Sequence, residues 1–582
     1  MLIKDVRKEF YDYVITSRSR LLVLVGYDLD SISATKILQY LLECHRIQYT
    51  IIPVKDKHQL LQSFQEHRDG LNACLLINIG NTFHVGEWLM PANTCRIFIC
   101  DTRRPINVFN AYASDVYLMT DITGLNSFTD EANIIPAYDD IFTDSDDDLD
   151  DEDIDRRQLS LQELEKRRSK KKNRYQWETK RNKLLFDYTE KTYCSYSTAL
   201  LIFDLSWKLS KDNNDLLWLA ILGVSDQMIN VKISQQKYDE QYQYIKEAMT
   251  RLKNIRGEPT IALNRIVTNA DQNVITNHNH LKITYEKDLK LSLYRHWSLY
   301  DSLRHTMYIS NKFKIWRLRG HKRLLAFLAE LGLPLSQCKQ KFSSMDLELR
   351  SNVKQWIEDL SNKYQLQSII GYTFIASRGF KDKYNCNDMA FAVRALLESA
   401  DKDKRANQKF FDAIDSLSWN NIQLLEKGLD LAKLQLSAIL KQVQIIVDSK
   451  QIQLLNDALW YVIISETTPD ANFFCYSGCL NQLSQYVLHA LAATNPKSKK
   501  SVCLPLVMIS PNPNRSGMAM ACGIPPIKTI HKAENFFSEV YVHINRRLKD
   551  FQLEHDLVDP CVAHLPYTQA LTFLNELAVL FA

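Results

Sequence analysis

The chain has 582 residues, of which 46% are hydrophobic and 10% aromatic. This composition predicts a globular protein of two or three domains and excludes a mainly disordered chain. Its 72 basic and 68 acidic residues give a formal net charge of +4, a near balance that does not by itself indicate a nucleic-acid-binding protein.

The N-terminus is charged where a signal peptide needs an apolar core. No apolar run approaches the roughly 20 residues that span a bilayer, so we expect an intracellular, soluble chain that makes no membrane contact. The 12 cysteines are scattered and lack zinc-ribbon spacing. We therefore expect reduced and mostly buried thiols.

The first 120 residues alternate short apolar runs with helical patterns. Runs that are too short for helices predict strands over residues 21–25, 49–54, 73–79 and 96–100. Between the first two runs, residues 31–44 carry apolar side chains at helical spacing. This rhythm of strand, helix and strand predicts a parallel sheet with helices on its faces.

Acidic residues follow two of these strands, at the point where α/β proteins place ligand chemistry. Asp28 and Asp30 follow the first strand, Asp101 follows the fourth, and Asp226 lies in a later helical segment. Hard divalent cations prefer such oxygen ligands, and a nuclease centre needs about four or five of them. These carboxylates are therefore candidate metal ligands.

Two positions lack what a metal centre needs. Asn78 ends the third strand with an amide in place of a carboxylate, and Thr102 and Arg103 follow Asp101 in place of imidazoles. A cationic Arg103 would repel a metal ion. The sequence therefore favours the alternative, in which the carboxylates cap helices and tie loops together. We expect no catalytic residue, no metal and no other cofactor.

The charge of the chain changes abruptly in the next segment. Residues 139–155 hold eleven acidic residues, and residues 156–183 hold twelve basic ones. We expect a disordered acidic insertion followed by a solvated, charged helix over residues 159–183. Thr143 and Ser145 lie among aspartates and are phosphorylation candidates. Candidates for nuclear import or phosphate contact, with a solvated helix face as the alternative, are Lys166, Arg167, Arg168, Lys170, Lys171 and Lys172.

The pattern is mostly helical from residue 184 to about residue 366. The clearest predicted helices cover residues 197–209, 236–255, 287–303, 322–331 and 346–364. The last third combines one or two helices over residues 407–449 and a closing helix over 567–581 with strands at 461–466, 502–510 and 518–524. No P-loop and no Gly-x-Ser-x-Gly elbow is present, so nothing supports nucleotide hydrolysis by a P-loop or acyl transfer.

Several ordered motifs run along the whole chain. They include Asp28-Leu29-Asp30, Cys100-Asp101-Thr102-Arg103-Arg104-Pro105, Pro136-Ala137-Tyr138-Asp139-Asp140, His296-Trp297-Ser298-Leu299-Tyr300 and Gly523-Ile524-Pro525-Pro526. Together they resemble the cell division control protein 45 family of replication factors. That family is similar to the RecJ exonucleases of the DHH phosphoesterase superfamily, whose Asp-His-His motif here is Asp101-Thr102-Arg103.

The resemblance implies an inactive member of that superfamily. Active members have an aspartate at the position of Asn78 and a histidine at the position of Thr102. The second RecJ-type domain carries a glycine- and histidine-rich motif, and the nearest segment here, residues 378–384, has no histidine. The vestigial site would comprise Asp28, Asp30, Asn78, Asp101, Thr102 and Asp226.

The resemblance also implies an α/β fold with three domains. A RecJ-like DHH domain with a parallel sheet would cover residues 1–226, including the acidic insertion and charged helix at about 139–183. A helical insertion domain that binds partners would cover residues 227–366, and a C-terminal α/β DHHA1-like domain would cover residues 367–582.

The function implied is that of a nuclear factor for the initiation and elongation of DNA replication. It would join the MCM ring and the GINS complex as a non-catalytic subunit of the replicative helicase, with ATP hydrolysis left to the MCM partner. Further implied partners are replication-initiation and polymerase factors and, weakly and without sequence preference, single-stranded DNA.

Two other hypotheses stay open at this point. The remaining carboxylates could serve a metal-dependent single-strand DNA exonuclease of the RecJ type. The acidic insertion could be regulatory, because phosphorylation at Thr143 or Ser145 would deepen a negative charge that occupies a basic partner surface or mimics DNA.

Overall fold

The computed structural model describes residues 1–17, 20–89, 95–120, 122, 134–142, 161–255, 281–379, 382–401, 404–496, 498–513, 515–548 and 551–581. In this part of the chain no helix is both long and apolar enough to cross a bilayer.

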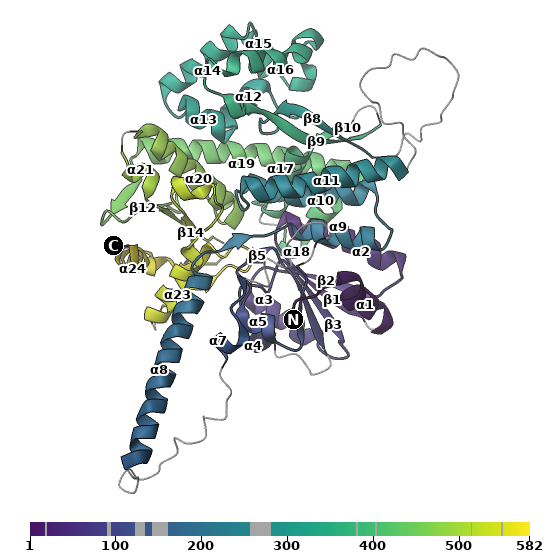
Figure 1. Cartoon of the computed structure of the whole chain (residues 1–582). Coiled ribbons are helices and arrows are strands. Elements are labelled where there is room, and N and C mark those ends of the chain that lie inside the picture. The colour runs from purple at the N-terminus through teal and green to yellow at the C-terminus, as the bar shows by residue number, and fades with distance from the viewer. Residues whose placement is uncertain are drawn as a thin grey trace.

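A five-stranded parallel sheet forms the N-terminal part of the molecule (Figure 1). Its strands, in spatial order, are β2 (Tyr49–Val54), β1 (Leu21–Gly26), β3 (Ala73–Ile77), β4 (Arg96–Cys100) and β6 (Val116–Leu118). Every neighbouring pair is parallel. The four predicted strands and the parallel sheet are therefore confirmed, with the third strand ending two residues earlier than predicted.

Both faces of this sheet are buried, which explains why its strands read as nearly continuous apolar runs. Along β1, Val23 and Val25 pack in one hydrophobic core and Leu22 and Leu24 in another, as the two-residue period of a strand requires. The helices of the first core include α1 (Asp12–Ser17), α2 (Leu29–Cys44), α9 (Thr198–Lys208) and α10 (Asn214–Ile229). Those of the second are α3 (Lys57–Glu66), α4 (Val85–Leu89) and α5 (Val108–Tyr112).

One long helix, α8 (Leu161–Thr189), projects from the body of the molecule (Figure 1). It confirms the helix predicted over residues 159–183. The short helix α7 (Tyr138–Ile141) lies where the predicted acidic insertion begins. After α8, β7 (Tyr193–Cys194) pairs antiparallel with β5 (Arg103–Arg104), which brings the chain back to the edge of the sheet.

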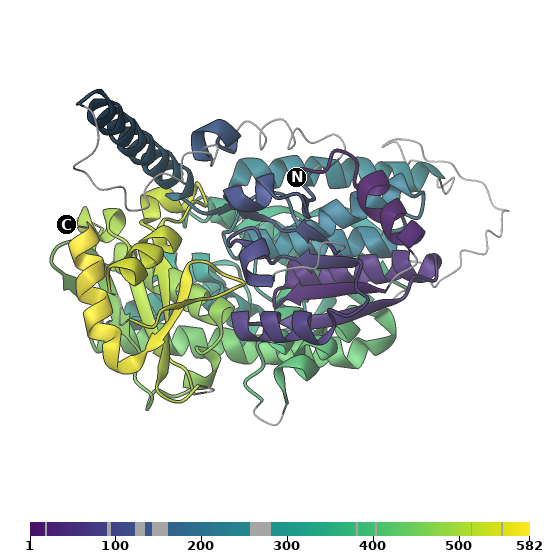
Figure 2. The same ribbon diagram turned by 90° about the horizontal axis from the view of Figure 1, so that it is seen from below.

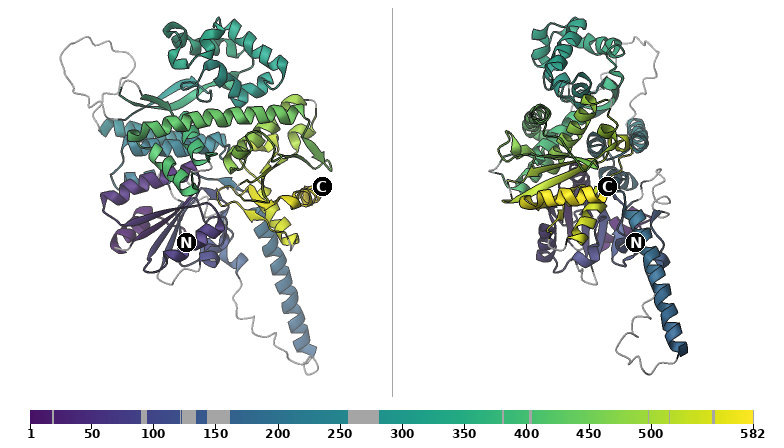
Figure 3. Two further views of the ribbon diagram at one scale, coloured as in Figure 1. Left: turned by 180° about the vertical axis from the view of Figure 1, so that it is seen from behind. Right: turned by 90° about the vertical axis from the view of Figure 1, so that its left-hand side faces the viewer.

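The middle of the chain combines helices with a small antiparallel sheet. The sheet has the order β10 (Asp382–Asn385), β9 (Ile370–Arg378) and β8 (Lys282–Leu289). The helices are α11 (Gln235–Ile255), α12 (Leu299–His305), α13 (Met307–Phe313), α14 (Leu318–Glu330), α15 (Leu335–Lys339) and α16 (Leu347–Ser361). Figure 3 shows α12 to α16 at the end of the molecule opposite α8.

The predicted helix over residues 287–303 is wrong. Its first residues belong to strand β8, a run of turns follows, and only Leu299–His305 is helical, as α12. β8 pairs with β9 along its whole length, from Lys282 opposite Ser377 to Leu289 opposite Ile370. That long-range pairing satisfies the backbone of β8 and overrides the weak helical pattern.

A six-stranded sheet forms the C-terminal part. Its strands, in spatial order, are β11 (Gln453–Leu455), β12 (Leu459–Ile463), β13 (Leu506–Pro511), β14 (Met518–Ile524), β16 (Val562–Pro566) and β15 (Glu554–His555). The remaining helices are α17 (Cys386–Leu397), α18 (Ala406–Ser416), α19 (Ile422–Asp448), α20 (Ser477–Thr494), α21 (Lys500–Cys503), α22 (Ile527–Ile530), α23 (Phe537–Arg547) and α24 (Ala570–Phe581). The three predicted strands and the closing helix are confirmed with shifted ends.

The 27-residue helix α19 takes part in two hydrophobic cores. Leu425 and Leu429 pack in the core that α2, α9 and α10 form, whereas Val443 and Ile446 pack against α20 and the C-terminal sheet. The helix also contacts α12. Figure 2 shows the N-terminal sheet (purple) beside the C-terminal part (yellow).

Direct contacts join these two parts of the molecule. Thr192 and Asn535 exchange backbone hydrogen bonds of 2.7 and 2.8 Å. Arg515 forms an ion pair of 2.6 Å with Asp56 at the start of α3. The domain boundaries at residues 226 and 366 stay a prediction.

Candidate functional site

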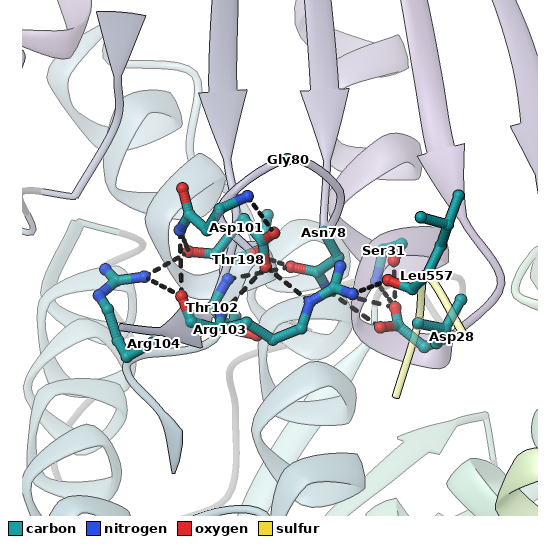
Figure 4. A network of polar contacts seen from close by, with 12 residues as sticks. Asp28, Ser31, Asn78, Gly80, Asp101, Thr102, Arg103, Arg104, Thr198 and Leu557 are labelled. Carbon is teal, nitrogen blue, oxygen red and sulfur yellow. Dashed lines mark hydrogen bonds and ion pairs between the residues drawn. The ribbon is translucent and has the colours of Figure 1, made fainter. Parts of the chain in front are cut away.

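Polar side chains meet at the carboxyl edge of the N-terminal sheet (Figure 4). Asp28 and Asp30 follow β1, Asn78 follows β3, and Asp101 follows β4. Since the carboxyl ends of parallel strands share one edge, the sequence positions of these residues bring them together. The convergence of these four positions, and of Thr102 next to Asp101, is thus a direct result of the sheet order.

Asp28 is the N-cap of α2. Its Oδ1 accepts a hydrogen bond of 2.7 Å from the backbone N–H of Ser31, and it also contacts the Ser31 hydroxyl. A carboxylate at a helix N-terminus satisfies free N–H groups and interacts favourably with the helix dipole. The capping role expected from the sequence is present at this residue.

Asn78 links the two carboxylates of the aspartate pair. Its Nδ2 lies 3.2 Å from both carboxylate oxygens of Asp28 and 3.2 Å from Oδ2 of Asp30. Its Oδ1 accepts hydrogen bonds from the Thr198 hydroxyl at 2.5 Å and from the Thr102 backbone N–H at 3.3 Å. A carboxylate could not donate in this way at neutral pH, so the amide supplies what an aspartate at this position would lack.

Asp30 is buried and is held by the N-terminus of α9. It accepts hydrogen bonds from the Ser197 hydroxyl at 2.5 Å and from the backbone N–H groups of Thr198 and Ala199 at 2.9 and 3.0 Å. Burial, and then the charge of Asp28, raise the pKa of Asp30 to about 6, against the opposing effect of these hydrogen bonds. Asp30 is therefore anchored to the second layer of the fold.

Asp101 is paired with Arg103. The Arg103 Nε donates to Oδ1 of Asp101 at 3.0 Å, and both side chains are buried. Burial alone would lower the pKa of Arg103, but the adjacent Asp101 raises it above its ordinary value, so the guanidinium stays charged. Arg103 also donates to the backbone carbonyl of Leu557, across the boundary to the C-terminal part (Figure 4).

Asp226 lies in α10 and is bonded to other partners. Its Oδ1 accepts from Nδ2 of Asn230 at 3.0 Å and lies 3.5 Å from Nε of Arg394. Burial raises the pKa of Asp226, while the charges of Arg394 and Lys232 oppose that shift. Asp226 and Asp28 line one cavity of about 30 Å³, together with Lys232, Arg394 and Asp559.

Lys232 brings a second cation to this cavity. Burial alone would lower its pKa, but the carboxylates of Asp559 and Asp28 raise it above its ordinary value. The Lys232 ammonium group therefore stays charged and balances the carboxylates, as a divalent cation would.

The arrangement does not fit a divalent metal ion. Each predicted carboxylate ligand is engaged by donors of the chain itself, and two of the nearby groups, Arg103 and Lys232, are cations. Across the described ranges, no three His, Cys, Asp or Glu side chains are grouped so that they could hold a metal. We therefore derive no chemical step through a metal at this edge of the sheet.

The predicted basic segment lies away from this centre, on the helix that projects from the body of the molecule (Figure 1). Residues 166–172 belong to α8, and within this segment the side chain of Lys172 is exposed. Thr143 and Ser145 lie outside the described residues.

Sequence reasoning missed Lys232, Arg394, Ser197 and Thr198. Lys232 had a weak signal, since it follows Asp226 by six residues, just past the end of the same helix. Ser197 is the first residue of a predicted helix and caps α9, which is a capping signal but not a signal for contact with Asp30. Arg394 had none, because its partner Asp226 is 168 residues away in the chain.

Comparisons with known proteins agree along the whole chain. A family model described as CDC45 matches residues 21–153 and 137–580. The cell division control protein 45 homolog of Mus musculus is 36% identical over 590 residues, which cover 100% of both chains.

Solved structures give matches over a similar length. The crystal structure of CDC45 from Entamoeba histolytica matches with a TM-score of 0.69 and 19% identity over 100% of both chains. The exonuclease RecJ bound to manganese matches with a TM-score of 0.43 and 10% identity, over 99% of this chain and 94% of that one. The first of these matches confirms the predicted mixed α/β fold with its parallel sheet.

Proposed function

This chain belongs to the CDC45 family of DNA replication factors, and from that premise we propose that it is a non-catalytic subunit of the replicative helicase. In this proposal it joins the MCM ring and the GINS complex in the nucleus and activates unwinding. Replication-initiation and polymerase factors are further partners.

The ion pair between Arg103 and Asp101 is the observation that carries the non-catalytic part of the proposal. A divalent cation bound to Asp101 would have to displace a buried guanidinium that is 3.0 Å from the carboxylate. Removing one partner of a buried ion pair costs about 3–5 kcal/mol, which a metal at so depleted a ligand set would have to offset. The vestigial centre thus supports a structural role.

The partner contacts are proposed for the helical segment over residues 227–366, between a DHH-like domain at 1–226 and a DHHA1-like domain at 367–582. Two observations support this assignment. Helices α12 to α16 stand at one end of the molecule (Figure 3), and the side chains of Leu318 and Leu347 there are 74% and 69% exposed. A partner that covered these side chains would remove their apolar surface from water.

The charged segments belong to the same proposal. Residues 166–172 would serve nuclear import or contact phosphates, and phosphorylation at Thr143 or Ser145 would strengthen the negative charge of the acidic insertion. Weak contact with single-stranded DNA is proposed for the pocket beside the vestigial centre, which Asp28, Thr102 and Arg103 line.

Reconstitution tests the helicase part. We expect a mixture of MCM ring and GINS complex to unwind a labelled DNA fork in the presence of ATP only when this chain is added. Equal unwinding with and without the chain would contradict the proposal.

The alternative is a RecJ-type exonuclease, and Asp28 and Asp226 still line one cavity. A nuclease assay therefore tests the proposal that the chain is non-catalytic. Purified protein is incubated with labelled single-stranded DNA and Mn²⁺, beside Asp28→Ala. We expect no cleavage that depends on Asp28, and such cleavage would support the alternative.

A further inference from the structure

A cluster of cations covers the helices at the end of the molecule opposite α8. Between Met307 and Met345 the chain holds eight lysines and arginines and one acidic residue, Glu330. The exposed or half-exposed cations Lys312, Arg317, Arg319, Lys322, Arg323 and Lys339, on α13, α14 and α15 and the turn between the first two, are called the basic ridge below.

The charge of the basic ridge is not neutralised within the described part of the chain. Glu330 forms an ion pair of 2.7 Å with Lys363 of α16, so its charge is already balanced. None of the six cations forms an ion pair with a described residue. Two of them lie over aromatic rings, Arg323 near Phe313 and Lys339 near Tyr300.

The geometry makes these cations neighbours. Arg319, Lys322 and Arg323 share one face of α14, because residues three and four apart lie above one another on a helix. At Gly320 a Cβ would lie only 2.1 Å from the carbonyl oxygen of Lys314, so a glycine allows α14 to start against the end of α13.

Tyr300 joins the two ends of the ridge. Its hydroxyl lies 3.4 Å from Nδ1 of His321 in α14, and its ring centroid is 5.5 Å from the ammonium of Lys339 in α15. The first turn of α14 and the last turn of α15 therefore lie on the same side of the molecule.

Exposed leucines are interleaved with the cations. Leu318, 74% exposed, stands between Arg317 and Arg319, and Leu335, 40% exposed, begins α15. A nucleic-acid backbone needs the cations but offers nothing to a leucine, whereas a protein segment can satisfy both. The combination favours a protein partner.

We propose that the basic ridge docks an acidic segment of a partner protein that carries apolar side chains among its carboxylates. The carboxylates pair with Arg319, Lys322 and Arg323, and the apolar side chains cover Leu318 and Leu335. Such complementarity raises the rate of association and fixes the register of the complex. This inference rests on the proposed function, because it gives the chemistry of one contact in the helicase assembly.

Two full-chain variants test the ridge. One reverses its charge with Arg319→Glu, Lys322→Glu and Arg323→Glu, and the other replaces its leucines with Leu318→Ser and Leu335→Ser. The matched controls are Lys528→Glu, Lys532→Glu and Arg546→Glu, which are exposed cations of the C-terminal part without a described ion pair, and Leu571→Ser, whose side chain is 62% exposed. Retention on an immobilised mixture of MCM ring and GINS complex is measured at several salt concentrations.

We expect each ridge variant to lower retention by about tenfold or more, because one variant loses the charged contacts of the interface and the other loses its apolar contacts. The control variants should bind like wild type. Retention of the wild type should fall as salt rises. Equal retention of folded ridge variants and wild type would overturn the inference but leave the proposed function standing. Failure of the wild type itself to bind would overturn both.

Binding to a labelled DNA duplex tests the remaining alternative, in which the ridge is a nucleic-acid site. If charge reversal weakens DNA binding while retention on the MCM ring and GINS complex is unchanged, the ridge is a nucleic-acid site and the inference is wrong. If DNA binding is the same in wild type and variant and retention falls, the acidic partner is supported.

Discussion

Asn78 shows how one amide can hold two carboxylates together. Its Nδ2 donates toward Asp28 and Asp30 at 3.2 Å, and its Oδ1 accepts from the Thr198 hydroxyl. The φ angle of Asn78 is 49°, in the left-handed region that asparagine tolerates better than most residues. The side chain and the backbone of this residue thus both suit the turn at the end of β3.

The buried Asp30 gives the protein a specific pH dependence. Its pKa in the folded state is about 6, above its ordinary value of 3.8, so the folded state binds this proton more tightly than the unfolded state. The stability from this group is fully present below about pH 3.8 and is lost as the pH rises through about 6. We expect Asp30→Asn to remove this fall from the free energy of unfolding, measured with urea across that range. As a control, Asp215→Asn changes an exposed aspartate of α10, and equal pH slopes for wild type and Asp30→Asn would contradict the prediction.

Lys232 should be required for stability because it stands among carboxylates. We expect Lys232→Met to lower the free energy of unfolding by about 1–3 kcal/mol, since Asp28, Asp226 and Asp559 would line a cavity that has lost this cation. Adding Asp559→Asn should recover part of the loss, as urea denaturation of both variants would reveal. Lys282→Met, at an exposed lysine without a described ion pair, is the control. A loss no larger than in this control would count against the role of Lys232.

The sequence predicts the frame of the site but not its bonding. Asp28, Asn78 and Asp101 could be placed together because each ends a strand of one parallel sheet. The place of Arg394 could not be predicted, since it reaches the site from α17, whose position depends on packing between distant segments. Lys232 had only its six-residue spacing from Asp226 as a signal. The sequence does predict that Arg103 opposes the binding of a metal ion, because this cation lies two residues after Asp101.

Helix packing around the site depends on a glycine in α10. At Gly223 a Cβ would lie 2.4 Å from Oδ1 of Asp30, 2.7 Å from the Ser197 hydroxyl and 2.8 Å from Cβ of Ala199. We expect Gly223→Ala to destabilise the protein by about 1–3 kcal/mol, because α10 must move away from α2 and α9. The midpoint of thermal unfolding would measure this destabilisation. The control is Gly86→Ala, whose Cβ would meet only the side chain of His84, at 3.3 Å. Equal midpoints for the two variants would show that the helices adjust freely.

Strand β8 shows where the reading of elements from sequence fails. Ile283, Tyr285 and Leu289 lie at alternate positions, but the polar Lys287 between them interrupts the apolar alternation, and residues 287–303 follow a helical pattern. The pairing partner β9 starts 81 residues after β8 ends, so no local signal could decide between strand and helix. In contrast, β1 to β4 are short, mainly apolar runs, and their prediction is confirmed.

At the scale of the whole molecule, Arg515 connects the N-terminal and C-terminal parts. Its guanidinium pairs with Asp56 at 2.6 Å and with Glu554 at 3.0 Å, and all three side chains are partly exposed. We expect Arg515→Ala to change the global stability by less than about 1 kcal/mol, because exposed ion pairs contribute little. Hydrogen exchange should nevertheless become faster at the start of α3 and along β15.

Arg547→Ala provides the comparison for that experiment, because Arg547 pairs with Glu576 within the C-terminal part. Its exchange pattern around Asp56 should match that of the wild type. Unchanged exchange at Asp56 in Arg515→Ala would mean that the backbone bonds between Thr192 and Asn535 hold the two parts together without it.

Helix α19 determines how a mechanical load would pass through the protein. Its 27 residues span about 40 Å at 1.5 Å per residue, and its two halves are embedded in different cores. Because α12, which directly precedes the ridge helix α13, contacts α19, we expect a displacement of the ridge helices to reach both cores, and with them the C-terminal sheet, through this one helix.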